Sequence, residues 1–383
     1  MEKSGTTKAI LCLLAALLIV ISLLIAPSLF TQPKNKVPDI FVGIDASFES
    51  VDDTKQLIDA VKSYTNLFVV GSTAITWNLT RLTEVCQYLN DSGLHFMTFA
   101  HPAAEMYFSQ TQWIKDARQQ WSSNYLGLYT YDEPGGHQID HDYFFMSAQE
   151  ASNYSDAAAT YVRNLTYYLS LVRNQWDIGN FPLFTSDYAL NEFDYRAGYN
   201  SVFTEFGFKN NSRQLAVALG RGAATVHNSD WGVMITGNLT DPDPYSGQKM
   251  YDDMVLAYNN GAKYILAFDY PSLKGGILRQ EHFDALKRFW QYIQSHPQKQ
   301  TPLAERVAYV VPKDYGFGFR GPTDKIWGLW EADEQSAQIW NQTISLIQQY
   351  GTNLDIVYED CPQLTLIGYS QLIYWNGTVL LHG

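Results

Sequence analysis

Between residues 40 and 295, short apolar segments alternate with longer amphipathic segments. The apolar segments, expected to be strands, cover 40–46, 66–70, 94–100, 125–131, 181–185, 201–206, 231–236 and 263–268. The amphipathic segments, expected to be helices, cover 52–64, 79–91, 110–122, 156–176, 190–197, 212–226, 247–260 and 280–295. Strands that alternate with helices form parallel sheets. Eight such units over roughly 250 residues predict a closed (β/α)8 TIM barrel.

A doubly wound open sheet is the structural alternative for the same alternation. That fold needs a glycine-rich nucleotide-binding loop after its first strand. The segment 43–47 (GIDAS), at the end of the first expected strand, contains no such loop. The barrel is therefore the favoured fold.

A second pattern begins after Pro302. The expected elements there are strands at 306–311, 354–358 and 371–375 and a helix at 330–350. We therefore predict a barrel domain at 39–300 and a small α/β accessory domain at 303–383. A loop rich in glycine and aromatic residues at 315–322 either contacts a ligand or packs against the barrel, and packing is the simpler interpretation.

The N-terminal segment predicts membrane attachment. Residues 9–30 are almost wholly apolar and uncharged, which is long enough for a helix to cross a bilayer. Lys3 and Lys8 precede this run, and a basic flank stays in the cytoplasm. We predict a cytoplasmic tail at 1–8, a retained single-pass transmembrane anchor at 9–30 and a linker at 31–38. A cleaved signal peptide is the alternative, but no clean small-residue cleavage site follows the run.

The glycosylation motif N-x-S/T supports the same orientation. The motif begins at Asn78, Asn90, Asn153, Asn164, Asn210, Asn238, Asn341 and Asn376. Acceptor sites of this kind are used on the outer side of a membrane, although a composition rich in polar loop residues also produces them. We therefore predict that the domains after the anchor are extracytoplasmic and carry glycans.

Composition excludes some classes of function. The net charge is −13 and no basic stripe is present, so nucleic acid is not an expected partner. The sequence has no HExxH motif, and the first strand lacks a His-x-His pair. A mixed metal site from Asp45, His101 and Asp269 is a minor alternative, and no cofactor is predicted.

Polar residues recur where the expected strands end. They include Asp45, His101, Asp132, Glu133, Asp187, Glu205, Asp269 and Tyr270. The C-terminal strand ends of a (β/α)8 barrel form the active-site mouth, so these side chains are expected to gather there. Buried carboxylates are unfavourable unless they are compensated, which favours a chemical role.

Two carboxyl groups on either side of a glycosidic bond are what its hydrolysis requires. We predict Glu133 as the general acid and Glu205 as its carboxylate partner. Asp132 is a third candidate catalytic residue, and strand alternation places it and Glu133 on opposite sides. Structural roles are the alternative: a turn cap for Asp132, or a salt bridge for Glu205.

Substrate contacts are expected from carboxylates and aromatic rings near the same mouth, because aromatic faces stack on sugar rings. The predicted substrate-binding residues are Asp45, His101, Tyr131, Asp187, Trp231, Asp269 and Tyr270.

Over residues 38–296 the chain resembles the superfamily of TIM-barrel glycoside hydrolases. The resemblance rests on the architecture and on two strand ends, 131–134 (YDEP) and 267–271 (AFDYP). In many of these enzymes the acid/base glutamate closes strand four, which implies that role for Glu133. Many place the nucleophile on strand seven, where 233–237 (VMITG) has no carboxylate, whereas others use strands four and six.

The C-terminal domain resembles the small flavodoxin-like or amidotransferase-like domains that follow some glycosidase barrels. It lacks a cysteine nucleophile in a sharp strand-to-helix turn, which implies an accessory role. Taken together, the sequence predicts a membrane-anchored, extracytoplasmic glycoside hydrolase that acts on carbohydrate. The alternative is a catalytically inactive barrel that binds glycans at the cell surface.

Overall fold

The computed structural model describes residues 39–100, 110–142, 147–207, 212–237, 245–270 and 277–382. The predicted tail, anchor and linker, and also His101, Asn210 and Asn238, lie outside these ranges. Within the described ranges, no helix is both long and apolar enough to cross a membrane.

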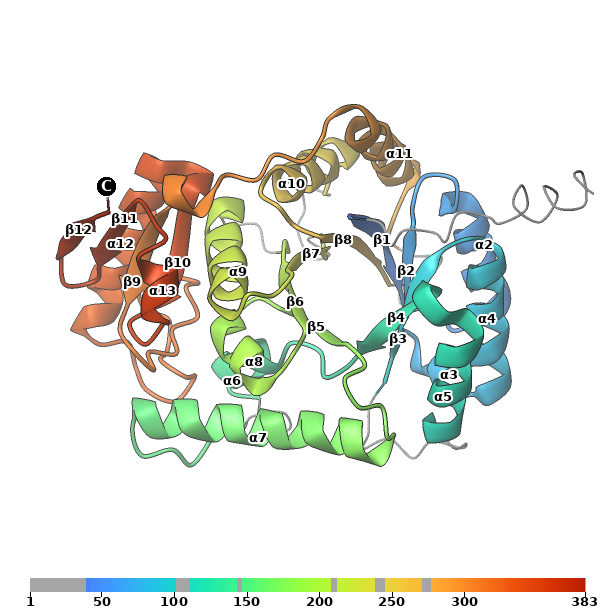
Figure 1. Ribbon diagram of the computed structural model, residues 1–383, viewed down its shortest axis with the longest axis horizontal. Helices are drawn as coiled ribbons and strands as arrows, with labels where there is room; N and C mark the ends of the chain where they lie inside the picture. The colour runs from blue at the N-terminus through green and yellow to red at the C-terminus, as the bar shows by residue number, and fades with distance from the viewer. Residues whose placement is uncertain are drawn as a thin grey trace, which may run out of the picture. The chain divides into compact units, whose positions relative to one another are not determined.

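The predicted barrel is confirmed. Parallel strands close into a ring in chain order, and β1 pairs with β8 (Figure 1). The strands are β1 (Phe41–Ala46), β2 (Leu67–Val70), β3 (His95–Phe99), β4 (Tyr125–Tyr129), β5 (Leu183–Asp187), β6 (Ser201–Glu205), β7 (Gly232–Ile235) and β8 (Tyr264–Asp269). Their bounds differ from the predicted ones by only a few residues.

Helices cover the outside of the ring (Figure 1). They are α2 (Val51–Val61), α4 (Leu79–Asp91), α5 (Gln110–Trp121), α7 (Tyr154–Gln175), α8 (Asn191–Ala197), α9 (Arg213–His227), α10 (Gly247–Asn259) and α11 (Gln280–Ser295). Two short helices were not predicted, α3 (Thr73–Thr76) after β2 and α6 (Pro134–Ile139) after β4. Both fill loops at the C-terminal ends of strands, where the periodicity of the sequence is too short to indicate a helix.

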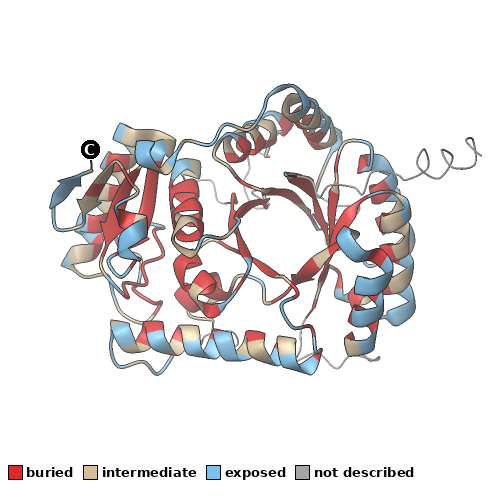
Figure 2. Cartoon of the chain, viewed as in Figure 1, coloured by how far each residue is buried: buried red, intermediate tan, exposed pale blue. Residues whose placement is uncertain are grey.

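The barrel interior is filled by aromatic and aliphatic side chains rather than left open. They are Phe41, Leu67, Val69, Met97, Tyr129, Phe184, Phe203, Met234, Tyr264 and Leu266. A second, larger apolar cluster lies between the strands and the helices. Figure 2 shows the buried strands and the buried inner faces of the helices, with exposed residues on the outer faces. The interior packing leaves polar groups space only at the strand ends.

The C-terminal segment forms its own sheet, in the order β10-β9-β11-β12. Its elements are β9 (Val307–Val311), α12 (Glu334–Tyr350), β10 (Leu354–Tyr358), α13 (Gln363–Leu366), β11 (Gln371–Tyr374) and β12 (Val379–Leu381). Strands β9, β10 and β11 are parallel, and the unpredicted β12 is antiparallel. We call residues 307–382 the C-terminal unit; it belongs to the same compact unit as the barrel, which begins at Ile40.

The C-terminal unit packs closely on the barrel helix α9. A Cβ on Gly222 would lie 2.3 Å from the Ile356 carbonyl oxygen, so only glycine allows this approach. The buried Asp355 carboxylate accepts hydrogen bonds from Arg221 Nε and Arg306 Nη1, each at 2.8 Å. Ion pairs and direct backbone packing therefore join the two parts.

The two cysteines in the described ranges, Cys86 and Cys361, are both buried and free.

Candidate active site

Inward-facing positions change from aromatic to polar as the strands approach their C-terminal ends. Residues two apart on a strand share a face. On β6, Phe203 fills the barrel and Glu205 follows it by two positions. On β5, Phe184 precedes Ser186 by the same spacing. Glu205 and Ser186 therefore project into the barrel mouth above the apolar core.

The chain turns sharply after β4, and we call residues 131–136 the acid turn. Tyr131 and Glu133 have left-handed backbone, with φ of 55° and 47°. Strand alternation therefore stops at the end of β4, and Asp132 and Glu133 do not point to opposite sides as a straight strand requires. Instead, both carboxyl groups join one polar network at the mouth.

The carboxyl groups of Glu133 and Glu205 hydrogen-bond to each other. Two carboxyl groups can do so only when one of them is protonated. Burial, reinforced by the charge of Asp132, raises the pKa of Glu133 to about 7. Burial and the charge of Glu133 raise the pKa of Glu205 well above its usual value. The pair therefore keeps one transferable proton near neutral pH.

Tyr129 and Ser186 connect this pair to Asp132. The Tyr129 hydroxyl donates to Asp132 and lies 2.8 Å from Ser186 Oγ. Ser186 Oγ in turn donates to Glu205 Oε1 at 2.8 Å. Asp132 is exposed to solvent although many protein atoms surround its carboxyl group, as expected at the floor of an open barrel mouth. The three acids thus share one hydrogen-bond network.

Asp45 adds a fourth carboxylate to the mouth. It lies on the inward row of β1, four positions after Phe41, and is only 4% exposed. Among the described residues, its Oδ1 atom has no hydrogen-bond partner. Burial, reinforced by the charge of Asp132, raises its pKa.

No lysine or arginine in the described part of the chain forms a salt bridge with Asp45, Asp132, Glu133 or Glu205. A concentration of buried acids without cations opposes folding, and such clusters mark functional sites.

Asp187 lies near this network but faces away from it. It follows the inward-facing Ser186, so its side chain points out of the barrel. Its carboxylate is fully buried and accepts hydrogen bonds from the backbone N–H groups of Gly135, Gly136 and Ala189. The structure therefore places Asp187 behind the acid turn rather than in the mouth.

Asp269 also lies on the outward row, one position after the inward Phe268 of β8. It accepts hydrogen bonds from the backbone N–H groups of Ile277 at 2.7 Å and Leu278 at 3.1 Å. The described bonds of Asp269 are thus to backbone N–H groups and not to the acid pair.

Trp231 and Tyr131 are not brought into the mouth. Trp231 is buried and immediately precedes β7, so it lies at the N-terminal end of the barrel. The Tyr131 ring packs outward against Tyr168 of α7, with 4.8 Å between ring centroids. His101 lies outside the described residues.

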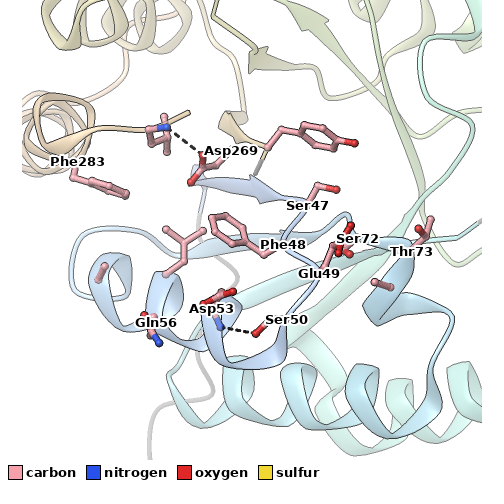
Figure 3. Close-up of a pocket in the computed structure, with 15 residues that line it drawn as sticks. Ser47, Phe48, Glu49, Ser50, Asp53, Gln56, Ser72, Thr73, Asp269 and Phe283 are labelled. Atoms are coloured by element: carbon pink, nitrogen blue, oxygen red, sulfur yellow. Dashed lines mark hydrogen bonds between the residues drawn. The ribbon is translucent and has the colours of Figure 1, made fainter. Parts of the chain in front are cut away.

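A cleft with a volume of about 780 Å³ opens at the C-terminal ends of β1, β2 and β8 (Figure 3). Its lining includes Ser47, Glu49, Ser72, Thr73, Asp269 and Tyr270. The Tyr270 side chain stacks on Phe268 with a centroid distance of 5.8 Å, and the residue is 41% exposed. The cleft therefore combines hydroxyl and carboxylate groups with an open aromatic ring, the combination that suits a sugar.

Sequence reasoning did not select Tyr129 and Ser186 as site residues. Both residues are at strand positions that face the barrel interior. Ser186, for example, is two residues after the interior Phe184 on the same strand. That signal was present in the sequence, but it becomes usable only once the barrel interior is known. Within the described ranges, no group of three or more His, Cys, Asp or Glu side chains has the arrangement of a metal site.

No known family model matches this sequence, and no curated protein sequence matches it. Among solved structures, the chain is similar to GH5_18 from Streptomyces cattleya, a crystal structure in complex with GlcNAc. The TM-score is 0.55 at 10% identity, and the match covers 89% of this chain and 100% of that chain. The Bacillus subtilis mannanase BCman gives a TM-score of 0.43 at 12% identity, over 71% of this chain and 93% of that chain. The first similarity shows a shared fold, the closed (β/α)8 barrel.

Proposed function

We propose that the protein hydrolyses glycosidic bonds with Glu133 as general acid and Glu205 as the partner carboxylate. The single observation that supports this most is the contact between two carboxyl groups with raised pKa values, in a mouth that has no salt-bridging cation among the described residues. A general acid must hold its proton near the working pH and yet release it, and a pKa of about 7 for Glu133 meets that requirement.

Glu133 suits the acid role because it is the less buried member of the pair, whereas Glu205 is only 5% exposed. Protonation of the glycosidic oxygen by Glu133 allows the bond to the anomeric carbon to break. This mechanism requires Glu205 to be ionised while Glu133 holds the proton once the glycan is bound. The Glu205 carboxylate then attacks that carbon or deprotonates a water that attacks it.

Substrate binding has to separate the pair. Carboxyl groups of retaining enzymes lie about 5–5.5 Å apart and those of inverting enzymes about 6.5–9.5 Å, both beyond hydrogen-bond distance. A sugar that enters the mouth replaces the hydrogen bond between Glu133 and Glu205 with hydrogen bonds to its own oxygen atoms.

We further propose that the cleft beside β1, β2 and β8 binds another sugar of the same glycan. Tyr270 supplies an exposed ring. Ser47, Ser72 and Thr73 supply hydroxyl groups (Figure 3). Asp269 shapes this cleft through its bonds to the backbone after β8.

Turnover of a broad glycan panel by the full chain and by two variants tests the proposal. Glu133→Gln keeps the side-chain shape and removes the acid, so turnover should fall by about a hundredfold or more while glycan binding persists. Asp253→Asn is the control, because Asp253 of α10 is buried and ion-paired with Arg213 of α9 and has no bond to the proposed acids.

Unchanged turnover in both Glu133→Gln and Glu205→Gln would exclude this pair as the catalytic acids. Glycan binding by the unmodified protein without any turnover would favour the alternative, an inactive barrel that binds glycans. In the first outcome the wild-type protein hydrolyses a glycan, and in the second it does not.

For location, we propose that residues 9–30 anchor the chain in the cell membrane with the barrel outside the cytoplasm. In the described ranges, none of the six asparagines that begin a glycosylation motif is buried. Asn78 caps α4 through Oδ1, which leaves Nδ2 available for a glycan. Protease added to intact cells should remove the barrel, and full protection of the barrel would refute this orientation.

A further inference from the structure

The acid turn is a strained segment that needs external support. Left-handed backbone costs a non-glycine residue roughly 1–2 kcal/mol, and the turn contains two such residues, Tyr131 and Glu133. Pro134 follows Glu133 and further restricts the backbone of the residue before it. A position of this kind persists only when surrounding contacts determine it.

The end of β5 provides the first contacts. Glu133 N–H donates to the Ser186 carbonyl oxygen at 3.0 Å. Asp187 then accepts the N–H groups of Gly135 and Gly136, at the beginning of α6. Hydrogen bonds from backbone N–H groups to a carboxylate are among the stronger ones in proteins. Asp187 therefore holds the two residues that follow Glu133 and Pro134.

The two glycines make this contact possible. A Cβ on Gly135 would lie 2.5 Å from the Ala189 carbonyl oxygen, and a Cβ on Gly136 would lie 2.3 Å from the Tyr188 ring. The segment 134–136 (PGG) therefore does not only end the strand. A larger residue in place of Gly135 or Gly136 would push the acid turn away from Asp187.

Asp187 has its own buried support in Asp194 of α8. The two carboxyl groups hydrogen-bond, and Tyr161 donates to Asp194 Oδ1 at 2.6 Å. Burial raises the pKa of both carboxyl groups, so this buried pair holds a proton between them. The three backbone N–H donors fix the position of the Asp187 side chain.

The C-terminal unit covers this support from outside. Trp327, which is fully buried, lies in the loop between β9 and α12. Its ring contacts Phe193 of α8 and Tyr161 of α7, with centroid distances of 4.7 and 5.6 Å. Its carbonyl oxygen accepts from Gln138 Nε2 of α6 at 2.9 Å. One residue of the C-terminal unit thus touches all three helices around the acid turn.

We propose that Asp187 is a positioning residue for Glu133 and that the Trp327 loop of the C-terminal unit completes its support. The C-terminal unit then serves the barrel by fixing the geometry of its acid rather than by binding a ligand of its own. The proposal rests on the proposed role of Glu133, but its geometric content is measurable without any substrate.

Carbon-13 labelling of glutamate carboxyl groups in the full chain allows the Glu133 titration to be followed by NMR, with Glu133→Gln for assignment. In Asp187→Asn, the amide NH2 group faces a glycine N–H, so the turn relaxes and the Glu133 carboxyl group becomes more exposed to water, which removes the burial that is the main cause of its raised pKa. The titration midpoint should then fall from about 7 towards the ordinary value near 4.5. Asp253→Asn should leave the midpoint unchanged.

If Asp187→Asn does not fold, two less disruptive variants, each with a control variant, test the same proposal. Tyr161→Phe removes only the hydroxyl that supports Asp194, and Tyr258→Phe removes a comparable buried hydroxyl on α10. Trp327→Leu removes the outer support, with the half-buried Trp340 of α12 as the matched control in Trp340→Leu. Tyr161→Phe and Trp327→Leu should shift the midpoint in the same direction as Asp187→Asn, and the controls should not.

On an active glycan, Asp187→Asn should reduce kcat by about tenfold or more with KM nearly unchanged, because the acid is misplaced while the substrate cleft is intact. Variants that lower the melting temperature but keep the wild-type Glu133 midpoint would overturn the positioning role. A shifted midpoint in a protein that hydrolyses no glycan would instead overturn the proposed function and leave the positioning role standing.

Discussion

Glu205 at the barrel mouth and Asp355 in the C-terminal unit are both buried carboxylates, but their partners differ completely. Asp355 is fully buried and is bonded to Arg221, Arg306 and Tyr369. Glu205 is 5% exposed, and its partners are Ser186 and another acid, Glu133. The first carboxylate is compensated by positive charge, whereas the second has a hydroxyl group and a neighbouring acid as its partners.

This difference separates a structural acid from a chemical one. A buried ion pair whose donors are all satisfied fixes the relative position of two elements, and removing one member leaves a buried charge. An acid that is surrounded by acids destabilises the fold but keeps its proton at neutral pH. Stability measurements and activity measurements should therefore respond in opposite ways at the two sites.

The largest effect is expected at the compensated site. Asp355→Asn leaves two buried guanidinium groups without their counter-charge and should lower the free energy of unfolding by about 3–5 kcal/mol. Chemical denaturation at neutral pH measures this loss. A loss below about 1 kcal/mol would place Asp355 among the weakly contributing ion pairs and remove the contrast with Glu205.

The corresponding change at the mouth should spare the fold and stop the chemistry. Glu205→Gln removes one of the adjacent acids, so the free energy of unfolding at pH 7 should stay the same or rise. Turnover of a glycan substrate should fall by about a hundredfold or more. Both quantities are measured on one preparation, and a large loss of stability would show that Glu205 is a structural acid like Asp355.

The pH dependence of stability sharpens the same contrast. The folded-state pKa of Glu133 is raised from 4.5 to about 7, so the folded protein binds a proton that the unfolded chain releases in this window. Stability from this group is therefore full below pH 4.5 and declines as the pH rises to about 7. The free energy of unfolding, measured across this pH range, should decline in the wild type and decline less in Glu205→Gln. If it declines equally in both proteins, the titrations of Glu133 and Glu205 are independent.

The smallest expected effect lies in the cleft. Tyr270→Ala removes an exposed ring that stacks on a sugar, which is worth about 0.5–1.5 kcal/mol or roughly 2–10-fold in KM, with kcat unchanged. Tyr167→Ala on α7 is the matched control, because Tyr167 is 64% exposed and remote from the mouth. If the two variants behave alike, the cleft does not bind the substrate.

The sequence was sufficient for the barrel because its signals are local. Helix α4 runs from Leu79 to Asp91 as predicted, since Asn78 caps its first turn and apolar residues recur with helical spacing. The C-terminal strand β10 likewise has the predicted bounds. Strand β12 was not predicted, because it is short and exposed and is stabilised by its pairing with β11.

The site was predictable only in part, because its geometry depends on contacts distant in sequence. Glu133 and Glu205 were selected from their positions at strand ends, and the structure brings their carboxyl groups together. Asp187 and Asp269 were selected by the same criterion. Each directly follows an inward-facing residue on its strand, so its side chain points out of the barrel. The left-handed backbone of Glu133 carries no local signal, since β5 and the C-terminal unit impose it.

If the barrel mouth binds glycans as proposed, its acids also affect which glycans approach it. Like charges repel more strongly where no neighbouring cation screens them. Sulfated, sialylated or uronic-acid chains would then be repelled by the ionised acids at the mouth, whereas neutral sugars would not. Added salt weakens such repulsion, so the salt dependence of turnover should differ between charged and neutral substrates.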